Sequence, residues 1–168
     1  MIRIAHTADI HYCPKHLKHV DLAFSSFVSD AITKQCDAAV IAGDSFDASM
    51  GIHEPAVSAY IEQVVRLAGA MPVLILQGTY SHDRPGCLDV IKQIPTSYEI
   101  YVADKPGQVL LQAGVWYQGG EITDNTIADG DALISCLPSL NKADPEIMAN
   151  GAKAAVSALA EQWAPNNE

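Results

Sequence analysis

The strongest constraint on the fold is an alternation of short apolar runs with longer amphipathic segments in the first half of the chain. Three apolar runs, Ile2–Ala5, Asp37–Ala42 and Pro72–Leu76, are predicted to be strands. The segments between them, Lys15–Cys36 and Glu54–Ala70, carry apolar residues at helical spacing. This order of strands and helices predicts parallel strands joined by right-handed crossovers, and hence an α/β fold.

The second half of the chain has a different pattern. An alanine-rich helix is expected to begin with Asp144 as its N-cap and Pro145 at its first position, and to reach about Trp163. Before it lie short strand candidates separated by Gly, Pro and Asp: Tyr98–Ala103, Val109–Leu111, Val115–Tyr117 and Ala132–Leu137. The 168 residues contain no interdomain linker and fit a single domain.

Composition excludes several classes of protein. No stretch approaches the roughly 20 apolar residues of a membrane helix, and the N-terminus lacks the pattern of a secretory signal, so a cytoplasmic protein is expected. The four cysteines are far apart and form no C-x-x-C pair, which argues against a zinc ribbon or a redox dithiol. Each cysteine is therefore interpreted as a small, mostly buried hydrophobic residue.

The formal net charge of −10 argues against a free-standing nucleic-acid binder, which usually presents a basic face to phosphates. Bound divalent cations can offset a carboxylate cluster, and basic surface can also lie on a part of the protein outside this sequence. The charge therefore does not argue against phosphoester chemistry.

Acidic and imidazole side chains follow each of the three predicted strands of the first half. In an open parallel sheet, the carboxyl ends of the strands form the edge where ligands bind. Clustered carboxylates repel one another unless a cation neutralises them, and mixed oxygen and nitrogen donors favour manganese, iron or zinc. An isolated Asp-x-His or Gly-Asp pair is often only a turn, but their joint occurrence predicts a metal site. The residues concerned are Asp9, His11, Asp44, Asp47, His82 and Asp83.

The order Asp9-x-His11, Gly43-Asp44-x-x-Asp47 and Gly78…His82-Asp83 resembles that of the calcineurin-like metallophosphoesterases. Within that superfamily, the segments IRIAHTADIHY, AAVIAGDSFD and LISCLPSLNKAD are similar to the SbcD-type DNA exonucleases. The resemblance implies a metallophosphoesterase-like β-sandwich flanked by helices and incomplete at the C-terminal side. It also implies a metal-dependent phosphodiesterase, a DNA exonuclease or endonuclease subunit of a double-strand-break repair or phage recombination complex.

The resemblance also assigns roles to individual residues. It implies that Asp9 and His11 bind a first metal, that Asp44 bridges two metals, and that His82, oriented by Asp83, is the acid or transition-state stabiliser near the leaving oxygen. The expected cofactors are two divalent ions, Mn²⁺ first, with Fe²⁺, Zn²⁺ or Mg²⁺ as alternatives. Water held between two such ions is a nucleophile for in-line attack on phosphorus.

Three further residues are candidates for supporting or substrate-binding roles. Asp47 is expected to support the site through a hydrogen bond to a ligand or water. His53 and Arg84 are candidates for contact with a substrate phosphate, although an ordinary loop position is the alternative for both. Two histidines, His16 and His19, share a helix face and are interpreted as solvated surface, and His6 as a core or supporting residue.

Two features depart from the family's pattern. The usual third motif is Gly-Asn-His-Asp/Glu, whereas here Ser81 precedes His82 and two extra residues follow Gly78. Ser81 is therefore only a candidate ligand, and a looser second metal is expected. All six histidines lie at or before His82, so the downstream histidines of the family are missing. Residues 1–168 are consequently expected to be the N-terminal portion of one nuclease domain, with weak or no activity alone.

The alternatives are another metallophosphoesterase, acting on a phosphoprotein or a small phosphodiester, and a non-catalytic scaffold that keeps the fold for dimerisation or partner binding. The partners implied by the resemblance are DNA, an SMC-like ATPase of the SbcC type and a second copy of the chain.

Overall fold

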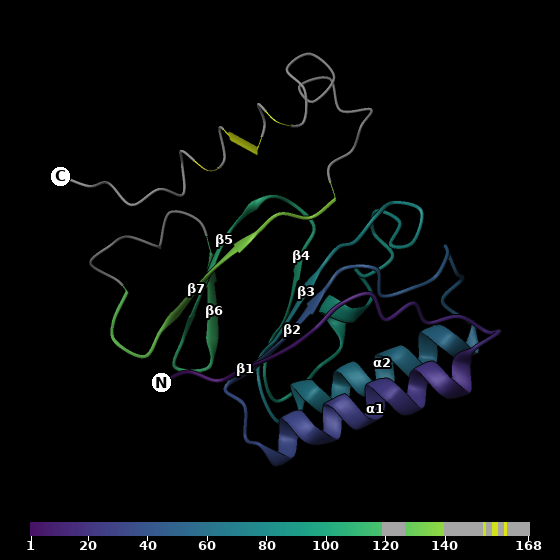
Figure 1. Ribbon diagram of the computed structural model, residues 1–168, viewed down its shortest axis with the longest axis horizontal. Coiled ribbons are helices and arrows are strands. Elements are labelled where there is room, and N and C mark those ends of the chain that lie inside the picture. The colour runs from purple at the N-terminus through teal and green to yellow at the C-terminus, as the bar shows by residue number, and fades with distance from the viewer. Residues whose placement is uncertain (119–126, 140–152, 154–155, 158–159, 161–168) are drawn as a thin grey trace.

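The computed structural model describes residues 1–118, 127–139, 153, 156–157 and 160. Its centre is a four-stranded parallel sheet in the order β1-β2-β3-β4 (Figure 1). Helix α1 connects β1 to β2, α2 connects β2 to β3, and the short 3-10 helix η1 precedes β4. The bounds are β1 Ile4–Thr7, α1 Leu17–Thr33, β2 Ala38–Ala42, α2 Pro55–Ala68, β3 Val73–Leu76, η1 Ile91–Gln93 and β4 Ile100–Ala103.

A smaller antiparallel sheet of three strands follows in the chain. It consists of β5 (Gly107–Gln112), β6 (Val115–Gln118) and β7 (Ala132–Cys136), in the order β6-β5-β7. A tight turn with positive φ at Ala113 and Gly114 joins β5 to β6. The described part of the chain therefore has two sheets of different type and two α-helices.

Alternation of side chains along the parallel strands divides the core into two layers. Residues such as Ala39, Ile41, Val73 and Ile75 are fully buried in one cluster with the apolar faces of α1 and α2. Because the chain moves across the sheet in one direction, two right-handed crossovers place both helices on the same face. Figure 1 shows α1 and α2 side by side on that face.

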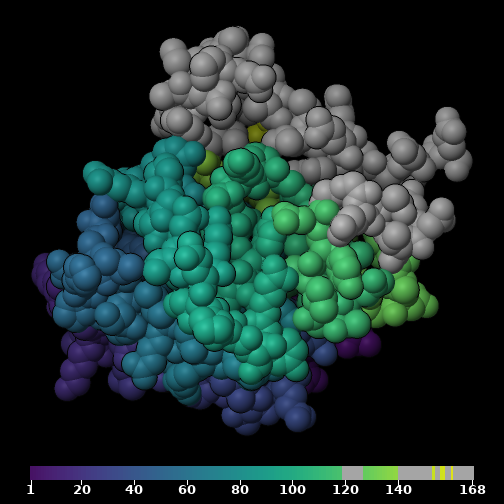
Figure 2. Space-filling view, turned by 180° about the vertical axis from the view of Figure 1, so that it is seen from behind, coloured from purple at the N-terminus to yellow at the C-terminus, as the bar shows by residue number. Residues whose placement is uncertain are grey.

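The opposite face of the parallel sheet packs on the antiparallel sheet. Ala38, Leu74 and Ala103 point into a second buried cluster with Val109, Leu111, Trp116 and Cys136. Period-two alternation thus gives each parallel strand one face for the helices and one for the second sheet. The result is three layers, with the parallel sheet in the middle (Figure 1). Seen from the opposite side, the teal residues from the middle of the sequence lie between the purple and blue residues of the N-terminal third and the green residues that include β7 (Figure 2).

The structure confirms the mixed α/β class and all three parallel strands predicted in the first half of the chain, and it adds β4 to that sheet. The first strand was placed two residues too early, because His6 and Thr7 pair with Val40 and Ile41 of β2. The predicted helix from Asp144 to Trp163 falls almost wholly outside the described residues.

Two of the four cysteines, Cys13 and Cys136, are buried as expected, while Cys36 and Cys87 are half-buried. His6 is exposed and is not a core residue, which corrects that interpretation. None of the helices that the structure describes is long and apolar enough to cross a membrane.

Candidate metal centre

The loop after β1 lies directly beside the loop after β2 at the carboxyl edge of the parallel sheet. Three backbone hydrogen bonds continue the pairing of the strands into the loops. The N–H groups of Asp9, His11 and Tyr12 donate to the carbonyls of Gly43, Asp44 and Ser45, at 3.2, 3.0 and 2.9 Å. The side chains of the two motifs are therefore held at fixed relative positions by backbone bonds.

The backbone conformation of these loops is unusual. Asp9, His11 and Asp44 have φ values of 51°, 55° and 47°, in the left-handed region that non-glycine residues rarely adopt. Only two other non-glycine residues in the described part of the chain, Gln35 and Ala113, share it. Strained backbone positions of this kind cluster at functional sites. Three of the five non-glycine residues with positive φ in the described chain are thus Asp9, His11 and Asp44, which were predicted to bind metal.

A close approach of two loops explains the glycines of the second and third motifs. Gly43 has a φ of 83°, and a Cβ added there would lie 3.2 Å from the Cα of Gly78. A Cβ on Gly78 would collide with the backbone nitrogen and the carboxylate of Asp44. The absence of a side chain at both positions therefore allows the third loop to pack against Asp44.

The side chain of Asp83 connects the loop after β2 to the loop after β3. Its side chain is fully buried, and its carboxylate accepts hydrogen bonds from the backbone N–H groups of Ser45, Phe46 and Gly78 at 3.1, 3.2 and 2.9 Å. Burial raises the pKa of Asp83 above its ordinary value, while the three N–H donors favour the charged form. These contacts differ from the predicted role of Asp83, which was to orient His82.

Buried tyrosines tie the first two loops to the helices. The hydroxyl of Tyr12 donates to Asp21 of α1 at 2.8 Å, and the hydroxyls of Ser45 and Tyr60 of α2 are hydrogen-bonded at 3.0 Å. The rings of Tyr12 and Tyr60 also pack edge to face, 5.4 Å apart. Burial raises the pKa of both phenols, so both stay neutral. The site consequently rests on packed, hydrogen-bonded side chains.

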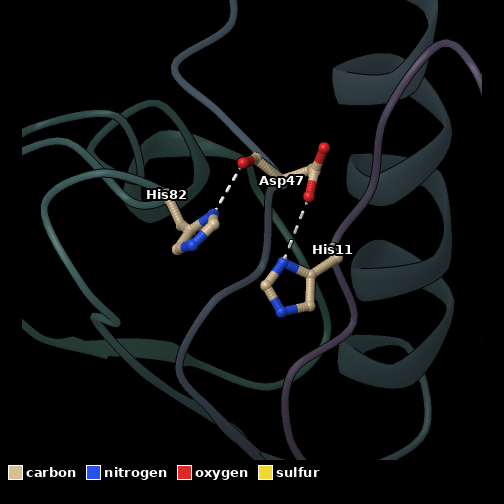
Figure 3. Close-up of side chains that lie close together, drawn as sticks. All are labelled: His11, Asp47 and His82. Atoms are coloured by element: carbon tan, nitrogen blue, oxygen red, sulfur yellow. Dashed lines mark hydrogen bonds and ion pairs between the residues drawn. The ribbon is translucent and has the colours of Figure 1, made fainter.

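The structure brings the predicted ligands together in two groups that share His11. Asp9, His11 and Asp44 each offer a ligand atom within 4.8 Å of the others, and so do His11, Asp47 and His82. Figure 3 shows the second group, in which His82 and His11 approach the same residue, Asp47, from different loops. The chain segments after three different strands thus converge on one place, as the sequence predicted.

Asp47 contacts both histidines. Its backbone carbonyl lies 2.6 Å from Nδ1 of His82, and its Oδ1 lies 3.7 Å from Nδ1 of His11 (Figure 3). The two imidazole rings pack edge to face with their centroids 4.8 Å apart. Because a carbonyl only accepts hydrogen bonds, Nδ1 of His82 carries its proton. Asp47 therefore orients His82, the role that the sequence had suggested for Asp83.

The predicted ligands fit a divalent cation on two grounds. Nδ1 of His11, the residue that both groups share, is buried 3.7 Å from Oδ1 of Asp47 and has no hydrogen-bond partner in the described structure, which is unfavourable unless a ligand satisfies it. The donors are one imidazole and two carboxylates, a set that suits manganese, iron or zinc. The two hydrogen bonds that the Asp44 carboxylate accepts, from the N–H and the hydroxyl of Thr79 at 2.6 and 3.0 Å, both end on Oδ1.

Ser81 does not contact Asp44 directly. Its hydroxyl lies 3.2 Å from that of Thr79, which in turn bonds Asp44. An open cavity of about 320 Å³ is lined by Asp9, Asp44 and Thr79. Pro138 and Ser139, in the segment after β7, also line it. This cavity gives the predicted ligands access to a substrate-sized space.

Besides Ser81 and Asp83, two further predicted residues lie outside both groups. His53 is exposed in the turn before α2, and Arg84 is exposed after the third motif. Sequence reasoning missed Thr79, Tyr60 and Ser139. The two residues inserted after Gly78 were the only signal for Thr79, and nothing in the sequence pattern indicated the other two.

No protein-family model matches the sequence, and a search of curated proteins found no match. The function is therefore inferred from the residues and their geometry.

Proposed function

We propose that the chain is a metal-dependent phosphoesterase domain of the calcineurin-like type, and that its substrate is DNA, as in the SbcD-type nucleases. The observation that carries the proposal is the convergence of Asp9, His11 and Asp44, whose ligand atoms lie within 4.8 Å of one another. Loops from two parallel strands build this group at the ligand-binding edge of the sheet. Its left-handed backbone and its buried imidazole nitrogen without a partner support a binding role.

Asp9, His11 and Asp44 are the residues that would hold divalent cations. When bound, such cations neutralise phosphate charge and lower the pKa of a coordinated water, which supplies a nucleophile at neutral pH. The residues of the chain keep the donors in place, since Thr79 fixes one oxygen of Asp44 and backbone bonds fix the loop of His11. Preorganisation of this kind avoids reordering the site when substrate binds.

His82 is the residue proposed to protonate the leaving oxygen. The carbonyl of Asp47 fixes the proton on Nδ1, so the other ring nitrogen, Nε2, is the one that exchanges a proton with substrate. Support for this role comes from the packing of the His82 ring edge to face on the ring of His11, with the ring centroids 4.8 Å apart. His82 thus combines a fixed tautomer with proximity to the reacting phosphate.

The DNA substrate and the partners are the finer part of the proposal. The net charge of −10 means that cations at the site, or basic surface on an SMC-like ATPase partner, would supply attraction for DNA. The apolar faces of α1 and α2 are buried against the sheet. A homodimer would therefore use other surfaces of these helices than those faces.

Manganese binding and manganese-dependent hydrolysis test the proposal together. Calorimetric titration of the chain with Mn²⁺ is expected to show binding that Asp44→Asn abolishes. The matched control is Asp30→Asn on the exposed side of α1, where the carboxylate pairs only with Lys34 and both side chains are about 60% exposed. This control should keep wild-type affinity, because an exposed ion pair contributes little.

Substrates of three kinds then separate the function classes. Cleavage of linear double-stranded DNA and of bis(p-nitrophenyl) phosphate supports the nuclease. Hydrolysis of p-nitrophenyl phosphate alone would indicate a phosphatase, and manganese binding without any hydrolysis would indicate a scaffold. A wild-type chain that binds no manganese would contradict the metallophosphoesterase assignment itself.

A further inference from the structure

A second, more enclosed cavity of about 200 Å³ lies against His82, on the inner side of the loop between β2 and α2. His82 belongs both to the wall of this cavity and to the group with His11 and Asp47. The cavity and the candidate metal centre therefore share one imidazole ring.

The walls of the cavity are apolar. Phe46 and Val57, which are 3% and 6% exposed, form its floor together with Met50 and Val90. Burial raises the pKa of the Cys87 thiol to about 12, so this wall residue is neutral. Apart from Cys87, His82 is the only ionisable side chain among the described residues that line the cavity. A phosphate or a sugar would gain little from these walls, whereas an apolar ring would gain from burial.

The size of the cavity limits its occupant. An apolar cavity of about 150 Å³ holds one benzene ring, so 200 Å³ accommodates a single ring with little space to spare. Ile52, which is 52% exposed, also lines the cavity and extends its apolar surface to solvent. Ser49 is a polar residue that also lines the cavity, and it is exposed to solvent.

We propose that this cavity binds a flat aromatic ring carried by the leaving group of the phosphoester. The inference rests on the proposed function, in which His82 protonates the leaving oxygen. The atoms bonded to that oxygen would then lie close to His82, and this cavity is an apolar space that His82 lines. A nucleobase of DNA and the ring of an aryl phosphate share this chemistry.

The test uses two non-hydrolysable ligands that differ only in the ring, phenylphosphonate and methylphosphonate, titrated into the full chain with saturating Mn²⁺. The wild type is expected to bind phenylphosphonate about 10- to 100-fold more tightly, the range for burying one aromatic ring. Ser49→Trp should fill the cavity from its exposed rim and reduce that ratio to near one. Ala48→Trp is the matched control, because Ala48 is exposed but does not line the cavity, and it should keep the wild-type ratio.

The same titration with thymidine 5′-phosphate and ribose 5-phosphate distinguishes the two sources of the ring. A preference for the thymidine ligand that Ser49→Trp removes assigns the cavity to a nucleobase, and a preference for phenylphosphonate alone assigns it to an aryl ester. Equal affinities for all ring and ringless pairs, with manganese-dependent binding retained, would overturn the ring site and leave the proposed function intact. Binding of no phosphonate in the presence of manganese would overturn both.

Discussion

Replacement of Gly78 by alanine tests the packing that holds Asp44 in place. A Cβ at Gly78 would lie 2.8 Å from the Cα of Asp44 and closer still to its backbone nitrogen and Oδ1. Two of these three neighbours are backbone atoms, so no rotation of a side chain removes the clash. One of the two loops must therefore move.

The size of the effect follows from the cost of overpacking. Inserting a methyl group into a filled space destabilises a protein by about 1–3 kcal/mol. For a chain of this length, each kcal/mol lowers Tm by about 2–4 °C, so Gly78→Ala should lower Tm by about 2–12 °C. Displacement of Asp44 should also weaken manganese binding by about tenfold or more, as loss of ligand support typically does.

The assays are thermal unfolding followed by circular dichroism and calorimetric titration with Mn²⁺. Gly51→Ala is the matched control, because a Cβ there would meet no heavy atom within 4 Å. It should change the free energy of unfolding by no more than about 0.5 kcal/mol and leave manganese affinity unchanged. Equal Tm and equal manganese affinity for the two variants would refute the close packing of Gly78 on Asp44.

Three further substitutions probe the supports of the site. Asp83→Asn replaces one of two carboxylate oxygens, both of which accept backbone hydrogen bonds, by an NH2 group that cannot accept, so the free energy of unfolding in urea should fall by about 1–3 kcal/mol; an unchanged urea midpoint would show that Asp83 does not join the loops. Tyr60→Phe breaks the bond to Ser45 and should cost about 0.5–1.5 kcal/mol in the same assay, and a more stable variant would contradict that link. His82→Ala should retain manganese but lose about 10²- to 10⁴-fold in manganese-dependent hydrolysis; full turnover would exclude it as the acid.

The layers of the fold were predictable because local patterns and the handedness of crossovers determine them. Apolar runs such as Asp37–Ala42 are too short and too apolar for surface helices. The sequence therefore predicted that they form buried strands paired with one another in a sheet. The start of β1 was less predictable. Among the described residues, β1 is an edge strand of the parallel sheet and pairs only with β2. An edge strand tolerates polar side chains such as the exposed His6 and the half-buried Thr7, so the apolar pattern did not mark its bounds.

The convergence of Asp9, His11 and Asp44 was also predictable, since parallel strands bring their carboxyl ends to one edge. The contacts that support them were not. The partner of His82 is a backbone carbonyl, and a sequence pattern of side chains contains no information about it. The three bonds to Asp83 depend likewise on loop conformations with left-handed residues, which are set by tertiary packing.

Diffraction at the manganese absorption edge from crystals soaked in Mn²⁺ is the most direct test of the metal centre. An anomalous peak is expected roughly 2.0–2.3 Å from oxygen atoms of Asp9 and Asp44 and from a ring nitrogen of His11. Peaks only at other places on the chain, or no peak under conditions in which the wild type binds manganese in solution, would contradict the assignment of these three residues as ligands.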